Sequence, residues 1–311
     1  MRSIFSKVSS AAKNAVYFQN KKKSEKLKNV KLIFSKVSIV AKNVIYLKRK
    51  KYTEKNKLDL LKDRHVEFSL GKYLIKTISP QNPLFERVLN LRYKIFFGHS
   101  CELCTDNDKF DNHCDHLIVI DTSVSNDFVV GTYRLLYKPK DIVDYKFYSE
   151  SEFDICNITR NKCNLLEAGR SCVQENYRDG RIIRLLWRGI TTYIKKNEVD
   201  LIFGCASFPS ANYLEFTKQL NYLKKFHSPP KAFQAYPRIH RKANFNKQDI
   251  PFGKCKEIFR TLPPLIKAYI RAGSWISPGA SVDKEFDTTD VLVVLKTKNI
   301  IKKYSDLEIT E

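Results

Sequence analysis

The chain lacks any long stretch of uncharged residues. Its longest run without Asp, Glu, Lys or Arg covers residues 201–214 and includes Pro209, whereas a membrane-spanning helix needs about 20 apolar residues. The N-terminus also lacks the unbroken apolar segment of a cleavable secretory signal. The sequence therefore predicts no transmembrane helix, and the eight cysteines are expected to be reduced thiols rather than disulfides.

Acidic side chains are scarce in the first 65 residues. This segment holds 4 Asp and Glu against 19 Lys and Arg, so it carries +15 of the net charge of +23 and leaves +8 for the rest of the chain. A cationic arm of this kind is expected to associate with polyanions, such as nucleic acid, anionic lipid head groups or an acidic protein.

The arm is an internal repeat, because residues 4–22 recur at 33–51 with 12 of 19 positions identical. Apolar residues of the second copy follow a spacing of three and four, which predicts an amphipathic helix, and each copy ends in a cluster of Lys and Arg. We expect residues 1–65 to form a basic amphipathic helical arm on an anionic membrane surface, where two linked anchors bind more tightly than one. A poorly ordered tail, a helix packed on the domain, a calmodulin-like or nucleic-acid partner and an organelle-import signal are the alternatives.

The rest of the chain has enough apolar residues for a core, since 43% of the sequence is hydrophobic and 12% is aromatic. The pattern predicts an α+β domain over residues 66–300, with a mixed sheet flanked by helices, and a tail at 301–311. Strands are predicted within residues 66–78, 116–121, 128–136, 165–173, 201–206 and 291–295. Helices are predicted at residues 83–97, 181–197, 212–223 and 264–272.

The most informative segment covers residues 166–188. It has the pattern of a strand, a basic turn and an apolar helix. Free backbone N–H groups and the dipole at a helix N-terminus both favour an anion, and Arg178, Arg181 and Arg184 add positive charge there. This arrangement indicates a site for a phosphate-bearing group.

This segment and five others resemble the GNAT-type acyltransferases, in the branch that includes acyl-homoserine-lactone synthases and ornithine-lipid N-acyltransferases. The tail at 262–275 and 286–290 is similar to the ornithine N-acyltransferases in particular, and the resemblance covers about residues 72–296. The six segments, in chain order, are residues 91–96, 108–111, 114–117, 131–136, 166–188 and 203–208.

The resemblance implies a GNAT-like mixed sheet and an N-acyltransferase that moves a 3-hydroxyacyl chain to the α-amine of L-ornithine. The product would be lyso-ornithine lipid, made at the inner face of the cell membrane. The implied donor is the 4'-phosphopantetheine thioester of acyl carrier protein, with no bound cofactor and no metal. The turn at 178–183 lacks two glycines that usually let the backbone approach coenzyme A, which favours the carrier arm.

The resemblance also implies roles for particular residues. Glu167 and Arg170 are the catalytic candidates, with Glu167 managing the amine proton or positioning the amine. In the amino-substrate pocket the carboxylates would bind the ammonium groups and a guanidinium would bind the carboxylate. The implied pocket residues are Arg92, Asp108, Asp111 and Arg134. The residues implied for the phosphopantetheine arm and carrier are Cys172 and Val173, whose backbone N–H groups would stabilise the oxyanion, with Arg178, Arg181 and Arg184.

Plainer interpretations stand beside these. Glu167 could be scaffolding paired with Arg170 or Arg134, and residues 108–111 could be a solvated loop. Function could instead be acyl-homoserine-lactone synthesis from S-adenosylmethionine, or membrane or nucleic-acid binding by a decayed acyltransferase fold, although no specific nucleic acid is expected. We expect no zinc at a cluster that lacks a second well-spaced ligand pair, namely His99, Cys101, Cys104, His113, Cys114 and His116.

Overall fold

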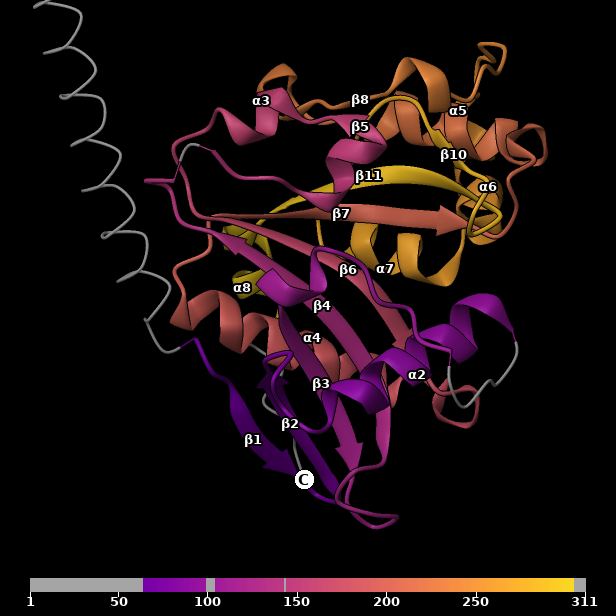
Figure 1. Cartoon of the computed structure of the whole chain (residues 1–311). Helices are drawn as coiled ribbons and strands as arrows, with labels where there is room; N and C mark the ends of the chain where they lie inside the picture. Colours follow the sequence, from indigo (N-terminus) through magenta and orange to yellow (C-terminus); the bar gives the residue numbers. More distant parts are fainter. Residues whose placement is uncertain (1–63, 99–103, 143, 305–311) are drawn as a thin grey trace, which may run out of the picture. The chain divides into compact units, whose positions relative to one another are not determined.

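The computed structural model describes residues 64–98, 104–142 and 144–304, which cover most of the range 66–300 (Figure 1). The predicted arm, except for its last two residues, and residues 305–311 of the predicted tail lie outside the described residues. None of the helices within the described ranges is both long and apolar enough to cross a membrane.

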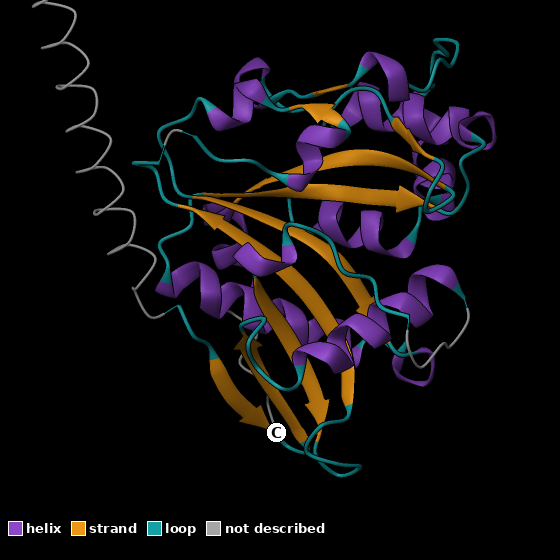
Figure 2. Ribbon diagram, viewed as in Figure 1, coloured by secondary structure: helices purple, strands orange, loops and turns teal. Residues whose placement is uncertain are grey.

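The domain is built on a nine-stranded mixed sheet with helices on both faces (Figures 1 and 2). Along its main path the strand order is β1-β2-β3-β4-β6-β7-β11-β10, and β9 pairs with β11. All neighbours are antiparallel except β6 and β7. The strands are β1 (Glu67–Leu70), β2 (Tyr73–Ile78), β3 (Asp115–Asp121), β4 (Val129–Lys138), β6 (Leu165–Val173), β7 (Leu201–Phe208), β9 (Trp275–Ile276), β10 (Ser281–Asp283) and β11 (Thr288–Lys296).

The helices divide between the two faces because alternate strand residues point to opposite sides. One face of β3 packs Leu117 and Val119 in the core cluster that holds α4, while Ile118 and Ile120 pack in the cluster that holds α2. Two short strands, β5 (Phe153–Asp154) and β8 (Tyr236–Pro237), pair separately. The helices are α2 (Phe85–Phe97), α3 (Cys156–Thr159), α4 (Arg181–Lys196), α5 (Thr217–Phe226), α6 (Cys255–Thr261), α7 (Pro264–Arg271) and α8 (Thr297–Tyr304).

The predicted α+β mixed sheet with flanking helices is confirmed. The strand predicted at 165–173 is β6, and the helix predicted at 181–197 is α4. The apolar residues of α4 pack against the sheet, and their helical spacing in the sequence is the reason that this helix could be predicted. The short elements β10, α6 and α8 were not predicted.

The sheet opens into a fork between β6 and β7. These strands pair only from Leu165 to Glu167 and from Leu201 to Phe203, and then diverge (Figure 1). Gly204 lies where the two strands part. A side chain does not fit there, because a Cβ would lie 2.1 Å from the carbonyl oxygen of Ala168. On its other edge β6 bulges against β4, and Arg170 adopts a φ of 50°.

We expect Gly204→Ala to lower the free energy of unfolding by more than about 3 kcal/mol, since the new methyl group meets backbone that cannot move aside. Urea unfolding measures this. Gly169→Ala is the matched control, because its Cβ would meet nothing within 4 Å and its φ is not positive, so a change within about 1 kcal/mol is expected. Equal losses in both variants would show that the fork does not depend on Gly204.

Candidate functional site

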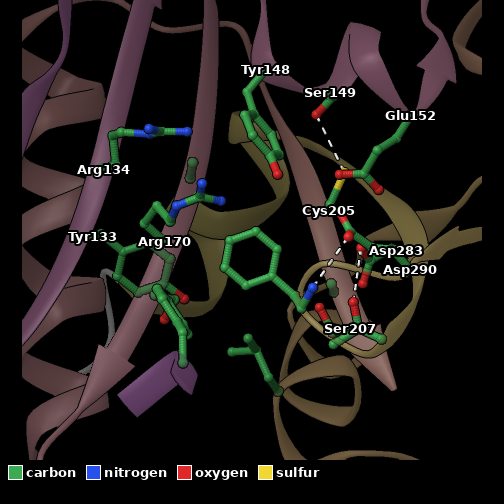
Figure 3. A pocket seen from close by; sticks show the side chains of 18 of the residues that line it. Tyr133, Arg134, Tyr148, Ser149, Glu152, Arg170, Cys205, Ser207, Asp283 and Asp290 are labelled. Carbon is green, nitrogen blue, oxygen red and sulfur yellow. Dashed lines mark hydrogen bonds between the residues drawn. The ribbon is translucent and has the colours of Figure 1, made fainter. Parts of the chain in front are cut away.

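A cavity of about 680 Å³ occupies the fork. Its lining includes Tyr133 and Ala168 from the face covered by α4, and Arg134 and Glu167 from the opposite face. The cavity therefore reaches side chains of both faces where the two strands no longer pair (Figure 3). Further lining comes from the end of α2, from a 3-10 turn named η2 (Tyr148–Ser151), and from β7, α7, β10 and β11.

One wall of the cavity carries two guanidinium groups, Arg134 from β4 and Arg170 from β6 (Figure 3). Tyr148 lies against both, with its ring centre 5.2 Å from the Arg134 guanidinium carbon and 4.7 Å from that of Arg170. Phe286 covers Arg170 at 4.8 Å. These stacked rings hold the two cations at the edge of the cavity.

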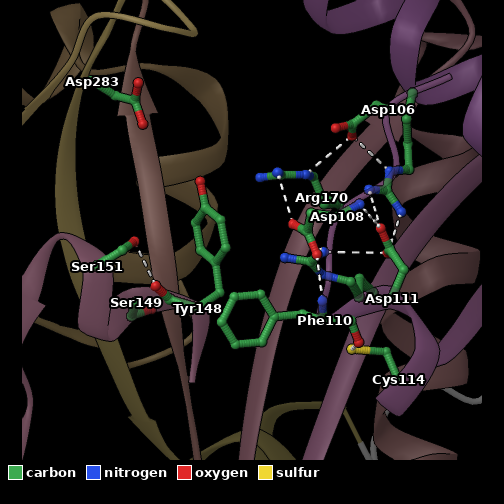
Figure 4. Close-up of polar contacts among 12 residues, drawn as sticks. Asp106, Asp108, Phe110, Asp111, Cys114, Tyr148, Ser149, Ser151, Arg170 and Asp283 are labelled. Atoms are coloured by element: carbon green, nitrogen blue, oxygen red, sulfur yellow. Dashed lines mark hydrogen bonds and ion pairs between the residues drawn. The ribbon is translucent and has the colours of Figure 1, made fainter. Parts of the chain in front are cut away.

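Behind this wall lies a network of three arginines and three aspartates (Figure 4). Arg92 has no exposed surface and bonds Asp106 at 2.8 Å and both oxygens of Asp111 at 2.7 and 3.2 Å. Asp108 accepts hydrogen bonds from Arg134 at 2.7 Å and from Arg170 at 3.1 Å. The charges in this network balance, so it is a rigid base for the cavity wall.

The structure thus brings the four residues predicted for the amino substrate together with Arg170. Only Arg134 and Arg170 of the network line the cavity. Burial opposes ionisation of Asp111, but the hydrogen bond and charge of Arg92, together with Arg134, outweigh it and hold the pKa of Asp111 at about 2. Asp108 and Asp111 are therefore already neutralised by arginines, which leaves little of their charge for an ammonium group.

Glu167 lines the cavity, but its carboxylate is engaged by η2. One oxygen accepts hydrogen bonds from the backbone N–H of Ser149 at 2.7 Å and from the Ser149 hydroxyl, and the other accepts the N–H of Tyr148 at 2.8 Å. Burial raises the pKa of Glu167, against the lowering effect of these hydrogen bonds. Glu167 thus fixes the turn that carries Tyr148, and it has no ion pair with Arg170 or Arg134 among the described contacts.

The opposite wall is acidic, and its importance was not recognised from the sequence. Glu152, Asp283 and Asp290 are buried side chains that line the cavity (Figure 3). Burial, with Asp290 close by, raises the pKa of Glu152, and burial also raises the pKa of Asp290. The motif at 286–290 was the one available signal, and the fold brings it into the cavity. The three carboxylates have the spacing that could also hold a metal ion.

The predicted carrier-binding residues lie outside the cavity lining. Cys172 and Val173 pair with β4, and the cavity lining from β6 ends at Ser171. Cys172 is buried, which raises the pKa of its thiol to about 12. Arg178, Arg181 and Arg184 are exposed at the N-terminal end of α4, where Asp179 pairs with Arg181 at 2.6 Å and accepts the backbone N–H of Arg181 at 2.9 Å.

The cysteine prediction needs one correction. Six cysteines in the described part of the chain are free thiols, but Cys104 is disulfide-bonded. The prediction was wrong there because it rested on compartment alone, which does not determine local pairing. Two of the residues at which no zinc was expected contact backbone carbonyl groups. Cys114 donates to the carbonyl of Phe110, and His116 Nε2 lies 3.2 Å from the carbonyl oxygen of Asp111.

We expect Glu167→Gln to lower both turnover and the free energy of unfolding, the latter by about 1–3 kcal/mol, because one acceptor becomes an NH₂ group facing a backbone N–H. Urea unfolding and a turnover assay measure the two effects. Glu150→Gln is the matched control, since Glu150 accepts a single backbone N–H with one oxygen and Gln can replace it. Lost turnover at unchanged stability would instead place Glu167 in proton transfer.

Arg92→Met should cost about 3–5 kcal/mol at neutral pH, because Asp106 and Asp111 both lose Arg92 and the three aspartates of the network are left with two arginines. The pairing of Asp111 stabilises the fold above its unfolded pKa of 3.8 and is lost as the pH falls toward about 2, so the deficit should shrink over that window. Urea unfolding at several pH values measures this. Arg87→Met on the same helix breaks only an exposed pair and should cost less than about 1 kcal/mol. A deficit that does not change with pH would contradict the assignment.

The chain is similar in sequence to known acyltransferases. A family model described as Acetyltransferase (GNAT) domain matches residues 91–188. An L-ornithine Nα-acyltransferase of Brucella abortus is 34% identical over 69% of this chain and 81% of its own length, and one of Agrobacterium fabrum is 38% identical over 64% and 70%. A solved CoA-dependent acyl-homoserine lactone synthase is 13% identical over 76% of this chain and 89% of its own, with a TM-score of 0.42. On its curated relatives, the chain belongs to the L-ornithine Nα-acyltransferase family of GNAT acyltransferases.

Proposed function

We propose that the chain transfers an acyl group from a thioester to the α-amine of L-ornithine, which is the first step of ornithine lipid synthesis. The observation that carries this proposal is the similarity to relatives named for that activity over most of their length. The fork cavity supports it, because one wall is cationic and the other is acidic, and ornithine carries one carboxylate and two ammonium groups.

The guanidinium wall suits the carboxylate of the amino acid. Arg134 and Arg170 line the cavity and are held by Asp108, so they can present N–H groups in a fixed orientation. We assign Arg92 and Asp111 to holding Arg134 in place rather than to contact with the substrate. This differs from the ammonium-binding role that the sequence predicted for Asp108 and Asp111.

The neutral amine nitrogen bonds to the thioester carbonyl carbon, the C–S bond breaks, and the proton that the nitrogen loses balances the one that the departing sulfur gains as a thiol. Past Glu167 the edge of β6 is no longer paired with β7, so its backbone N–H groups can face the oxyanion as it forms. Tyr133 and Tyr269 share a 3.0 Å hydrogen bond at the cavity, and burial raises the pKa of both, so they stay protonated and can supply a proton to the departing sulfur.

We assign the acyl donor to acyl carrier protein, carrying a 3-hydroxyacyl chain on its phosphopantetheine. The exposed Arg178, Arg181 and Arg184 at the start of α4 support this, because three cations against the single carboxylate of Asp179 leave a positive surface that suits a phosphate and an acidic protein. The cationic repeat of residues 1–65 supports association with the inner face of the cell membrane by its charge.

The test incubates purified protein with 3-hydroxyacyl carrier protein and ornithine. We expect release of carrier thiol and formation of one equivalent of N-acylornithine, measured with a thiol reagent and by mass spectrometry. Nα-acetylornithine should not react, because its α-amine is blocked. Acyl-CoA in place of the carrier should react more slowly.

Other outcomes would point elsewhere. Thiol release with S-adenosylmethionine but not with ornithine would favour an acyl-homoserine-lactone synthase. Acylation of Nα-acetylornithine would place the reaction on the side-chain amine. No release with any amino acid would favour a binding protein on an inactive acyltransferase fold.

A further inference from the structure

We propose that Glu152, Asp283 and Asp290 form an ammonium subsite that binds the side-chain ammonium of a diamino acid and selects it over amino acids without that charge. This inference rests on the proposed function, because it takes the amino acid to be the occupant of the fork cavity. It names the part of the cavity that recognises the substrate.

The three carboxylates converge from separate parts of the chain. Glu152 follows η2, Asp283 ends β10, and Asp290 lies in β11. Each offers an oxygen atom, and these atoms all lie within 4.8 Å of one another. The side chains are only 1%, 3% and 5% exposed, and all three line the cavity. Buried carboxylates at such distances repel one another unless a cation or a proton lies between them.

The acidic wall contains acceptors to which no donor group of the described residues points. Asp283 is occupied, because one of its oxygens pairs with Arg241 at 3.0 Å and the other accepts the N–H of Glu285 at 2.9 Å. Glu152 Oε2 and Asp290 Oδ1 are buried and accept no hydrogen bond from a donor group of the described residues, and the two carboxyl groups lie close enough to share a proton. Buried polar atoms without a donor are rare in native proteins, so these two indicate a cationic donor that the site receives in place of the shared proton.

An alkylammonium group matches those acceptors. It is a compact cation with three N–H donors, and the wall offers Glu152 Oε2 and Asp290 Oδ1 as acceptors beside Asp283. Arg241 pairs with one of the three carboxylates, and a proton shared by Glu152 and Asp290 neutralises one more, so one negative charge remains for a cation. Phe286 and Leu265 line the same cavity and can pack against the aliphatic stem that ends in the ammonium.

A divalent cation is the competing occupant. Calcium and magnesium take six or more oxygen ligands, whereas the wall supplies three carboxylates and one of these is bound to Arg241. The ammonium is therefore the better match. It also agrees with the opposite wall, where Arg134 and Arg170 suit the α-carboxylate, so the α-amine of a diamino acid would lie between the two walls at the fork.

The first experiment compares ornithine with norvaline, which has the same carbon chain without the side-chain ammonium. In the full-length protein, kcat/KM for ornithine should exceed that for norvaline, and Glu152→Gln or Asp290→Asn should reduce this ratio by about 10- to 100-fold. Glu150→Gln is the matched control, because Glu150 lies on the same turn but does not line the fork cavity, and its ratio should stay at the wild-type value.

The second experiment measures binding without acyl transfer. δ-Aminovalerate keeps the carboxylate and the terminal ammonium but has no α-amine, so it should raise the melting temperature of the wild-type protein while norvaline does not. The rise should be lost in Glu152→Gln and Asp290→Asn. Each variant alone should melt at or above the wild-type temperature, because one of the repelling carboxylates has been made neutral.

The outcomes separate the two proposals. Ornithine acylation with no preference over norvaline would keep the function and overturn the subsite. Selective stabilisation by δ-aminovalerate without any thiol release would keep the subsite and overturn the function. Equal loss of kcat/KM for both substrates in the variants would overturn the subsite, as would activity that EDTA abolishes and magnesium or calcium restores.

Discussion

The site depends on the early end of pairing between β6 and β7. The two strands share three residue pairs, and beyond them the carbonyl of Ala168 faces Gly204 at a distance that leaves no room for a side chain. A continuous sheet would close this gap with hydrogen bonds. Because the strands part, the cavity reaches side chains of both faces, and the backbone edge of β6 becomes available to a substrate.

The two walls of this cavity differ in whether their buried charges balance. Behind Arg134 and Arg170, three arginines and three aspartates balance one another, as expected where buried charges serve to hold a position. On the other wall three buried carboxylates face a single arginine, Arg241. The raised pKa of Glu152 and of Asp290 lets the pair share a proton, and the negative charge that remains beside the cavity suits a cationic ligand.

Residues that follow one another in a regular element were predictable from the sequence. The bounds of β6 and the apolar face of α4 follow from alternation and helical spacing, and the family resemblance pointed to Glu167, Arg134 and Arg170. The predicted role of Asp108 did not anticipate its ion pairs, because spacing cannot show which carboxylates meet a guanidinium. Glu152, Asp283 and Tyr269 were missed because only the folded chain brings them to β6 and β7.

Glu167 connects the two walls. Its carboxylate accepts hydrogen bonds from Tyr148 and Ser149, which begin η2, and Tyr148 stacks on both arginines of the cationic wall. The residue that follows the same turn is Glu152 of the acidic wall, whose N–H donates to the carbonyl of Ser149. The buried carboxylate of Glu167 therefore fixes two positions at the fork. One is that of the Tyr148 ring, which stacks on the guanidinium groups, and the other is that of Glu152, the proposed ammonium acceptor. A residue in that position can control catalysis through geometry even where it never touches the amine proton.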